Sequence, residues 1–247
     1  MADLARSTST ASPPGPVAGV TRRWWPVAAV VLYVLALLLG LWAKGAGRFS
    51  PELGWDIALS HDRVGVFSAV ALWINTVLQP LGGVVILAAA CLLLWSRRGL
   101  PTALAFGSTV CAGWLPAALG KVLVDRARPP LTATHALMPE LGTDSFPSGH
   151  TELAAALVLA AVLVIAVTRR IRRLVGIIGG VFTLVVATSR LYLGVHYPSD
   201  VLGSLLAATA GALLWTWLWR GWIEPWLEGR FPLLAGTRGT TTPGRHV

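Results

Sequence analysis

Long apolar runs alternate with short polar segments along most of the chain. The longest apolar runs cover residues 24–43, 80–95, 101–123, 148–167, 174–193 and 198–219. A helix needs roughly 20 mostly apolar residues to cross a bilayer. The pattern therefore predicts an all-α protein, built as a bundle of six transmembrane helices.

One apolar stretch is harder to interpret. Residues 64–78 are also apolar, but together with residues 80–95 they are too long for a single span. A break rich in proline and glycine, at residues 79–83, divides the stretch in two. We expect 64–78 to form an interfacial or partly buried helix, and the sequence leaves open whether it spans the membrane. The polar residues 44–62 predict a loop outside the hydrocarbon.

The two ends of the chain differ in composition from the apolar runs. Residues 1–23 are rich in Ala, Ser, Thr and Pro and end in Arg22 and Arg23. The run that follows is long enough to span a bilayer and has no small-residue cleavage pattern after it, which favours an uncleaved first span. We expect 1–23 to be a disordered cytoplasmic tail, 24–222 to be the six-span domain and 223–247 to be a cytoplasmic C-terminal tail.

Composition and charge place the chain in the membrane class. Hydrophobic residues make up 55% of the sequence and charged residues only 13%. The net charge of +9 does not point to nucleic acid, because the basic residues sit in short tracts between apolar runs. The N-terminal tail, Arg97 and Arg98, residues 169–173 and residues 220–247 together hold 13 of the 20 Lys and Arg. The positive-inside rule then puts both termini in the cytoplasm of a multi-pass cell-membrane protein.

Three polar clusters interrupt the second half of this apolar pattern. They contain Lys121, Arg128 and Pro129; then Pro147, Ser148, Gly149 and His150; then Ser189, Arg190, His196 and Asp200. Alternating spans would bring all three clusters to one face of the bundle, at the extracytoplasmic ends of helices 3 to 6. Ionisable groups at membrane depth are costly, so such a cluster predicts a functional site.

The first group of these residues suits an anion. Arg128 and Arg190 each offer a planar fork of donors to a tetrahedral oxyanion, and Lys121 adds a compact positive charge. Ser148 and Gly149 begin a helix after a proline, where backbone N–H groups and the positive end of the helix dipole favour negative charge. We therefore expect a phosphate-binding site.

The remaining residues suit acid, base and nucleophile chemistry. His196 and Asp200 are four residues apart, which puts them on one face if the helix starts near Pro198. The carboxylate would then hold one ring nitrogen of His196 and leave the other as nucleophile or base. His150 remains to protonate the departing oxygen.

Taken singly, each cluster also has a purely structural interpretation. Arg190 can form a salt bridge with Asp200 or Glu152, and the other clusters can be a positive stop signal or a plain helix start. The joint presence of all three on one face argues against these interpretations. The remaining histidines are expected to have capping or packing roles: His61, His135 and His246.

The three clusters resemble the signature of the type 2 phosphatidic acid phosphatase superfamily. That signature reads Lys-x6-Arg-Pro, Pro-Ser-Gly-His and Ser-Arg-x5-His-x3-Asp, and every fixed position is present in about a third of the chain. The resemblance implies a metal-independent integral membrane phosphatase without a cofactor. Phosphate would be bound by Lys121, Arg128, Ser148, Gly149 and Arg190.

The resemblance also implies roles for the reacting residues. His196 would attack phosphorus and form a phosphohistidine, Asp200 would orient it, and His150 would act first as acid and then as base. No metal site is expected, since Asp125, Asp144 and Glu152 lack a recognisable ligand spacing. Asp125 and Arg126 are expected to form a local ion pair.

The expected partners are the bilayer and a lipid mono- or diphosphate, dephosphorylated at the outer face. A polyprenyl diphosphate, phosphatidylglycerol phosphate or phosphatidic acid would each fit. Two alternatives stay open: a lipid phosphotransferase that uses the same site, and a non-catalytic membrane protein that binds anionic lipids. The soluble vanadium haloperoxidases of the superfamily are disfavoured by the apolar sequence. The oligomeric state is not predicted.

Overall fold

The computed structural model describes residues 23–61, 63–140, 142 and 144–230, and the regular elements in them are helical. The 1–22 tail, His246 and the rest of 231–247 lie outside the described residues. The helices are α1 (Trp25–Gly45), α2 (Leu53–His61), α3 (Gly65–Leu78), α4 (Pro80–Arg98), α5 (Leu100–Val124), α6 (Gly149–Ala160), α7 (Arg169–Tyr192), α8 (Pro198–Leu218) and α9 (Glu224–Arg230). The all-α prediction is confirmed.

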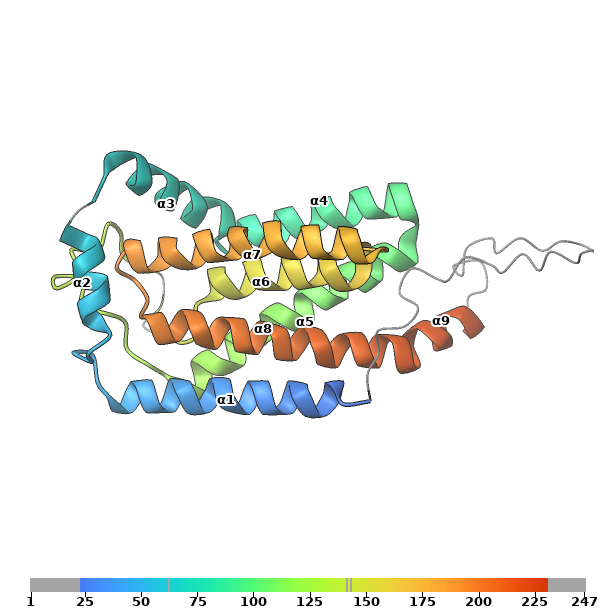
Figure 1. Ribbon diagram of the computed structural model, residues 1–247, viewed down its shortest axis with the longest axis horizontal. Helices are drawn as coiled ribbons and strands as arrows, with labels where there is room; N and C mark the ends of the chain where they lie inside the picture. Colours follow the sequence, from blue (N-terminus) through green and yellow to red (C-terminus); the bar gives the residue numbers. More distant parts are fainter. Residues whose placement is uncertain (1–22, 62, 141, 143, 231–247) are drawn as a thin grey trace, which may run out of the picture.

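The long helices lie side by side along one axis (Figure 1). The start of α1, the α4–α5 turn, the start of α7 and α9 are at one end of the bundle. The end of α5, the start of α6, the end of α7 and the start of α8 are at the other, which α2 crosses. The arginine-rich segments therefore share one end, and the three polar clusters share the opposite end.

Five helical runs in the described part of the chain are long and apolar enough to cross a membrane. They are Trp25–Gly45, Pro80–Arg98, Leu100–Val124, Arg169–Tyr192 and the continuous run Pro198–Arg230. Two further apolar helices are shorter: α3, and α6 with the π-helical turn Ala161–Ile165 that extends it. The expected break at Gln79 and Pro80 is present, since α3 ends and α4 begins there.

Three boundaries differ from the sequence prediction. Residues 44–62 were expected as a loop but contain α2. The fifth run was expected from residue 174, whereas α7 begins at Arg169 because the Thr168 side chain caps the helix by accepting a hydrogen bond from the Ile171 N–H at 3.2 Å. The last helical run continues to Arg230, beyond residue 219, where the sixth apolar run was expected to end.

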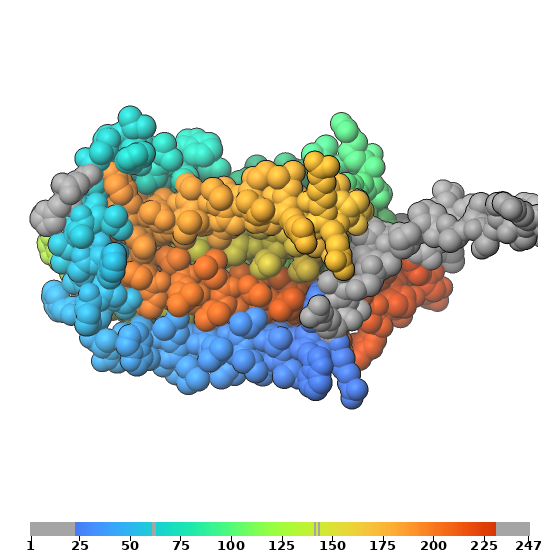
Figure 2. Space-filling model, in the orientation of Figure 1, coloured from blue at the N-terminus to red at the C-terminus, as the bar shows by residue number. Residues whose placement is uncertain are grey.

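The centre of the bundle is formed by α6, packed against α5, α7 and α8. Figure 2 shows α6 only in the gap between α7 and α8, with α1 alongside. Small residues allow close approach: a Cβ atom at Gly211 of α8 would collide with the Ala112 carbonyl oxygen of α5. This tight packing sets the positions of the helix ends that carry the polar clusters.

Candidate active site

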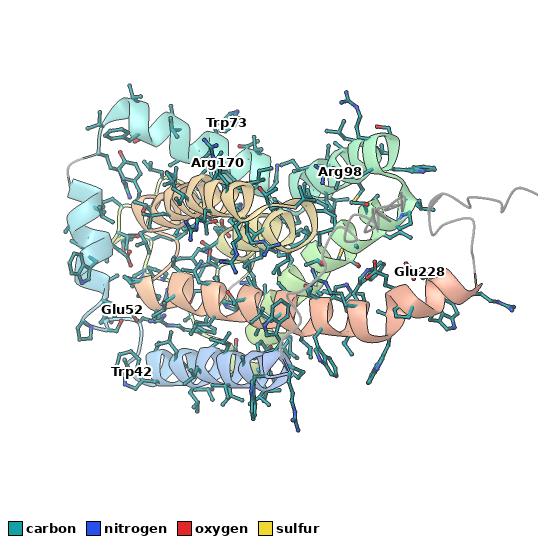
Figure 3. The ribbon with its side chains drawn as sticks, turned by 45° about the vertical axis from the view of Figure 1, so that its right-hand side comes forward. Trp42, Glu52, Trp73, Arg98, Arg170 and Glu228 are labelled. Atoms are coloured by element: carbon teal, nitrogen blue, oxygen red, sulfur yellow. The ribbon has the colours of Figure 1, made fainter. Side chains whose placement is uncertain are left out.

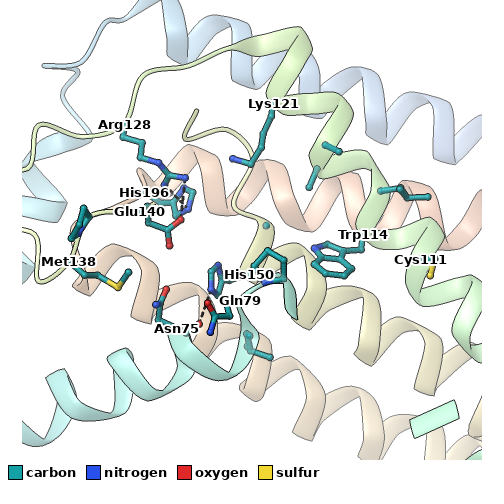
Figure 4. A pocket seen from close by; sticks show the side chains of 17 residues that line it. Asn75, Gln79, Cys111, Trp114, Lys121, Arg128, Met138, Glu140, His150 and His196 are labelled. Atoms are coloured by element: carbon teal, nitrogen blue, oxygen red, sulfur yellow. Dashed lines mark hydrogen bonds and ion pairs between the residues drawn. The ribbon is translucent and has the colours of Figure 1, made fainter. Parts of the chain in front are cut away.

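A half-open cavity of about 580 Å³ lies where the polar clusters meet. Its walls come from the α3–α4 junction, from α5, from the loop before α6 and from the residues before α8. The close-up shows Arg128, His196 and Glu140 together, with Lys121 reaching toward them and His150 beside Asn75 and Gln79 (Figure 4). Apolar side chains from Cys111 to Ala118 continue the cavity along α5.

Backbone pairing joins the first cluster to the second. The Ser145 N–H donates to the Arg126 carbonyl at 2.7 Å, and Ala127 forms an isolated bridge with Asp144. The Lys121 ammonium donates to the Asp144 carbonyl at 2.8 Å. The segment after α5 and the segment before α6 are thereby held side by side.

A buried aromatic ring joins the second cluster to α8. Phe146 is inserted between α1 and α8, where Gly40 and Gly203 make room for it: a Cβ atom at either glycine would collide with the ring. Nearby, the Ser204 hydroxyl lies 3.0 Å from the Ser148 carbonyl and 2.8 Å from the Asp200 carbonyl. The start of α6 is thus fixed against the start of α8.

His196 lies buried between the carboxylate of Asp200 and the guanidinium of Arg128. Its Nδ1 is 3.4 Å from Oδ2 of Asp200, and its Nε2 is 3.3 Å from NH1 of Arg128. Since a guanidinium can only donate, this arrangement favours a proton on Nδ1 and a lone pair on Nε2. Burial, and then the charges of Arg128 and Arg190, hold the pKa of His196 well below its ordinary value. The ring is therefore neutral, as a nucleophile must be.

A carboxylate occupies the space between two of the predicted phosphate-binding residues. Glu140 forms an ion pair with the Arg190 guanidinium, and its other oxygen lies 3.2 Å from NH2 of Arg128. A carboxylate bound by two guanidiniums occupies the kind of site that a phosphate would fill. The geometry therefore provides an anion position between Arg128 and Arg190, next to His196.

Asn75, at the end of α3, positions two more of the predicted residues. Its side-chain oxygen accepts a hydrogen bond from NH1 of Arg190 at 2.7 Å. Its backbone carbonyl accepts one from Nε2 of His150 at 3.2 Å. Helix α3 therefore contributes directly to the site.

All eight predicted site residues converge on this cavity. Five of them line it: Lys121, Arg128, Gly149, His150 and His196. The other three, Ser148, Arg190 and Asp200, are fully buried behind the lining. The Ser148 N–H is not free for an anion as expected, because it faces the Asp200 carbonyl at 3.4 Å.

One expected ion pair, and the salt bridge considered as a structural alternative for Arg190, are absent among the described residues. Asp125 and Arg126 do not pair: Asp125 has a left-handed backbone (φ 49°) that ends α5, and its carboxylate lies 3.6 Å from Lys44. Arg190 pairs with Glu140, not with Asp200 or Glu152.

Arg126 instead lies among acidic residues near the start of α8. Its guanidinium contacts Asp200 and Glu52, and the charges of these two carboxylates act on the neighbouring Asp56. Burial, and then the charges of Asp200 and Glu52, raise the pKa of Asp56 to about 8. In the described part of the chain, no group of three or more His, Cys, Asp and Glu is placed to hold a metal ion.

Sequence reasoning missed four residues of the site: Asn75, Glu140, Arg126 and Glu52. Glu140 and Glu52 are isolated acids in loop or helix-end sequence, and Asn75 lies in an apolar helix, so none belongs to a recognisable pattern. Arg126 lies between Lys121 and Arg128 in the sequence, and its position two residues before Arg128 was the one feature that could have marked it as a site residue.

Residues 99–224 match the family profile of the PAP2 superfamily, and this segment is about half of the chain. It contains all three polar clusters.

Two characterised relatives from Bacillus subtilis (strain 168) match shorter segments. Phosphatidylglycerophosphatase B is 40% identical over 92 residues, which cover 34% of this chain and 43% of the relative. Undecaprenyl-diphosphatase BcrC is 39% identical over 74 residues, which cover 30% of this chain and 35% of the relative. The match thus spans less than half the length of either relative.

A solved structure has a similar fold over most of the chain. It is the crystal structure of a transmembrane PAP2-type phosphatidylglycerolphosphate phosphatase from Bacillus subtilis, with a TM-score of 0.59 and 24% sequence identity. The similarity covers 82% of this chain and 97% of that one. The helical bundle is therefore the same kind of fold as in that membrane protein.

Proposed function

Because the chain belongs to the PAP2 superfamily, we propose that it is an integral membrane phosphatase that removes phosphate from a lipid mono- or diphosphate. One observation carries the proposal. His196 lies with Asp200 at one ring nitrogen and Arg128 at the other, beside an anion position in an open cavity. A protein that only bound anionic lipids would need the cations but not this nucleophile.

Phosphate binding is assigned to Lys121, Arg128, Gly149 and Arg190, whereas Ser148, whose N–H faces the Asp200 carbonyl, is assigned to positioning the start of α6. The supporting contact is the Glu140 carboxylate, which already lies between the guanidiniums of Arg128 and Arg190. An incoming phosphate displaces this carboxylate, and Arg128 then donates to phosphate oxygens in place of Nε2 of His196. The cations offset the charge that develops on the transferred phosphoryl group.

In the first step, Nε2 of His196 attacks phosphorus. The new N–P bond forms as the bond from phosphorus to the lipid oxygen breaks, and His150 gives that oxygen a proton. Asp200 holds the Nδ1 proton and stabilises the charge that the ring acquires. With a diphosphate, the leaving group is the lipid monophosphate.

In the second step, water resolves the phosphohistidine. His150, now deprotonated, takes a proton from water while the water oxygen bonds to phosphorus and the N–P bond breaks. Inorganic phosphate leaves and His196 is restored. The proposed cycle uses only side chains of this chain, so we expect activity to survive removal of divalent metals.

We further propose six bilayer crossings, with both termini cytoplasmic and the site on the extracytoplasmic side. The shared end of the arginine-rich segments supports this sidedness. In this arrangement α6 with its π-helical turn is the fourth crossing, and α3 is a partly embedded helix ahead of α4. The exposed apolar face of α3, which includes Val66, Phe67 and Trp73, supports its contact with lipid.

The substrate is proposed as a class. The relatives are by name a phosphatidylglycerophosphatase and an undecaprenyl-diphosphatase, so both lipid monophosphates and prenyl diphosphates are candidates. The cavity supports an apolar tail, because its wall along α5 includes Trp114 and the exposed Leu115. A lipid chain lying on this wall would leave its headgroup beside His196.

Phosphate release by the purified protein tests this proposal. The detergent-solubilised protein is assayed in excess EDTA against polyprenyl diphosphate, phosphatidylglycerol phosphate and phosphatidic acid. We expect release from at least one lipid, and loss of it in His196→Ala. Asp125→Asn is a matched control, since Asp125 is exposed and pairs with Lys44 outside the cavity.

The outcomes separate the alternatives. Release that persists in His196→Ala contradicts the assigned nucleophile. Transfer to an added alcohol without free phosphate indicates the phosphotransferase. No phosphate release from any of the lipids, in a protein that still binds them, indicates a non-catalytic protein that binds anionic lipids.

A further inference from the structure

We propose that Arg126 is a positioning residue of the active site, which acts on the reaction only through Asp200. This inference rests on the proposed function, because it concerns the acid that orients the nucleophile. Arg126 is two residues before Arg128, but the two side chains have different surroundings. Arg128 lines the cavity, whereas Arg126 is buried among carboxylates behind it, 2% exposed.

The Arg126 guanidinium contacts three side chains near the start of α8. NH1 donates to Oδ1 of Asp200 at 2.6 Å and to the Ser199 hydroxyl at 2.7 Å. NH2 donates to Oε1 of Glu52 at 2.5 Å. One arginine therefore joins the segment after α5 to the start of α2 and to the first turn of α8.

The contacts divide the two oxygens of Asp200 between different tasks. Oδ1 accepts from Arg126, while Oδ2 accepts from the Tyr197 backbone N–H at 3.0 Å and faces Nδ1 of His196 at 3.4 Å. With Oδ1 held, the carboxylate cannot rotate and Oδ2 stays directed at the imidazole. Arg126 thus determines which oxygen His196 meets, and at what angle.

The electrostatic role of Arg126 follows from burial. Asp200 is completely buried, and a buried carboxylate is costly unless a charge and hydrogen bonds compensate it. Among the described residues, Arg126 is the cation in ion-pair contact with it. Without this guanidinium, Asp200 would lose its counter-charge and one of the contacts that fix its orientation.

The surroundings of Arg126 hold the guanidinium itself in place. Its central carbon lies 3.8 Å from the centre of the Tyr197 ring, a cation–π contact. Glu52 also accepts from the Ser199 N–H and hydroxyl, both at 2.9 Å, and so fixes the entrance of α8. Figure 3 shows Glu52 at this end of the bundle, away from Arg98 and Glu228. Helix α2, unexpected from the sequence, thereby supports the site.

This placement predicts a specific kinetic signature. Arg126 does not face the anion position, so its loss should leave phosphate binding intact and lower the rate of the chemical step. Arg126→Met should reduce kcat by about 10- to 100-fold, the range typical for loss of an outer partner of an active-site group. The inhibition constant for vanadate, a phosphate mimic, should stay within about threefold of the parent value.

A double-mutant cycle tests whether the effect passes through Asp200. The kcat of the parent protein is compared with that of Arg126→Met, Asp200→Asn and the double variant. If Arg126 acts only by holding the Asp200 charge, the double variant should be within about threefold of Asp200→Asn. The proposal would be overturned if the two single-variant losses of kcat multiplied in the double variant, or if Arg126→Met left kcat unchanged.

Two further variants complete the experiment. Arg126→Lys keeps the positive charge but loses the planar guanidinium, so its kcat should fall less than that of Arg126→Met. If Arg126→Met does not fold, the double-mutant cycle is made with Arg126→Lys and Asp200→Asn. Arg220→Met is the control: Arg220 donates to the Leu163 carbonyl at 3.0 Å at the opposite end of the bundle, and its effect should multiply with that of Asp200→Asn. A parent protein without activity would refute the proposed function, whereas an active parent with an additive cycle would refute only the role of Arg126.

Discussion

Glu140 forms an ion pair with Arg190 inside the cavity, from a loop that connects two of the three polar clusters. The side chain of Arg190 is completely buried, so its charge must be compensated. Glu140 provides that compensation. The same carboxylate is then a competitor of every anionic substrate.

Replacement of Glu140 should therefore tighten anion binding. In Glu140→Gln the amide keeps the shape of the side chain but removes the negative charge next to the phosphate position. We expect the inhibition constant for vanadate to fall by about tenfold, which corresponds to about 1.4 kcal/mol of removed repulsion. The measurement is a vanadate titration of phosphate release.

A second glutamate controls for the loss of a negative charge in general. Glu228 is exposed on α9, at the opposite end of the bundle, so Glu228→Gln should leave the vanadate constant unchanged. Weaker vanadate binding in Glu140→Gln would mean that the carboxylate organises the two arginines and does not compete with phosphate.

The pH dependence of activity should reflect the low pKa of His196. Burial and the neighbouring cations, Arg128 first among them, depress this pKa, so the ring is neutral at pH values above the depressed pKa and protonated only below it. Because a protonated ring cannot attack phosphorus, kcat/KM should fall on the acid side only well below the ordinary histidine value of about 6.5. The profile must be corrected for ionisation of the substrate phosphate. An acid-side decrease of kcat/KM that is centred at pH 6.5 or above after this correction would count against His196 as the nucleophile.

The slot that holds Phe146 should tolerate no extra methyl group. A Cβ atom at Gly203 would collide with the Phe146 ring, so Gly203→Ala must push the ring and the adjoining start of α6 away from α8. We expect a loss of about 1–3 kcal/mol of stability, the usual cost of overpacking, and a parallel loss of activity. Thermal unfolding in detergent measures the loss of stability.

Gly180→Ala is the matched control for this substitution. Gly180 also lies in a long helix, α7, but a Cβ atom there would meet nothing within 4 Å. The control should unfold at or slightly above the temperature of the parent, because alanine is the better helix former. Equal stability of the two variants would show that the Phe146 slot can widen freely.

Sidedness can be measured with single cysteines. In a background with Cys91 and Cys111 replaced by alanine, Phe49→Cys places an exposed thiol at the site end, and Ser96→Cys places one beside the arginines at the other end. An impermeant maleimide added to intact cells should label the first, and should label the second only after permeabilisation. The reverse pattern would invert the proposed topology.

The apolar pattern predicted the helices well because long hydrophobic runs have few alternatives in a bilayer. It placed the ends of α1, α5 and α8 within a few residues, and it brought the polar clusters to one end by counting alternating runs. It misplaced the start of α7, since the arginines there are good helix formers and the helix continues through them.

The sequence could not predict which side chains pair with one another within the site. Motif spacing put Arg190 near the other clusters, but only the folded loop reveals Glu140 beside it. Similarly, Arg126 follows Asp125 in the sequence, which suggested an ion pair between them. The left-handed backbone at Asp125 instead directs the two side chains to different partners. Contacts between residues far apart in sequence decide both cases.

The central claim is that His196 becomes phosphorylated, and His150→Asn tests it most directly. An aryl phosphate carrying a labelled phosphoryl group has a leaving group that needs no acid, so the variant should still form the N–P bond but should hydrolyse it slowly. Rapid mixing should give a burst of about one aryl alcohol per chain, with the label retained on the protein and absent in the His150→Asn/His196→Asn double variant. Aryl alcohol and free phosphate released in step, with no label on the chain, would contradict the account.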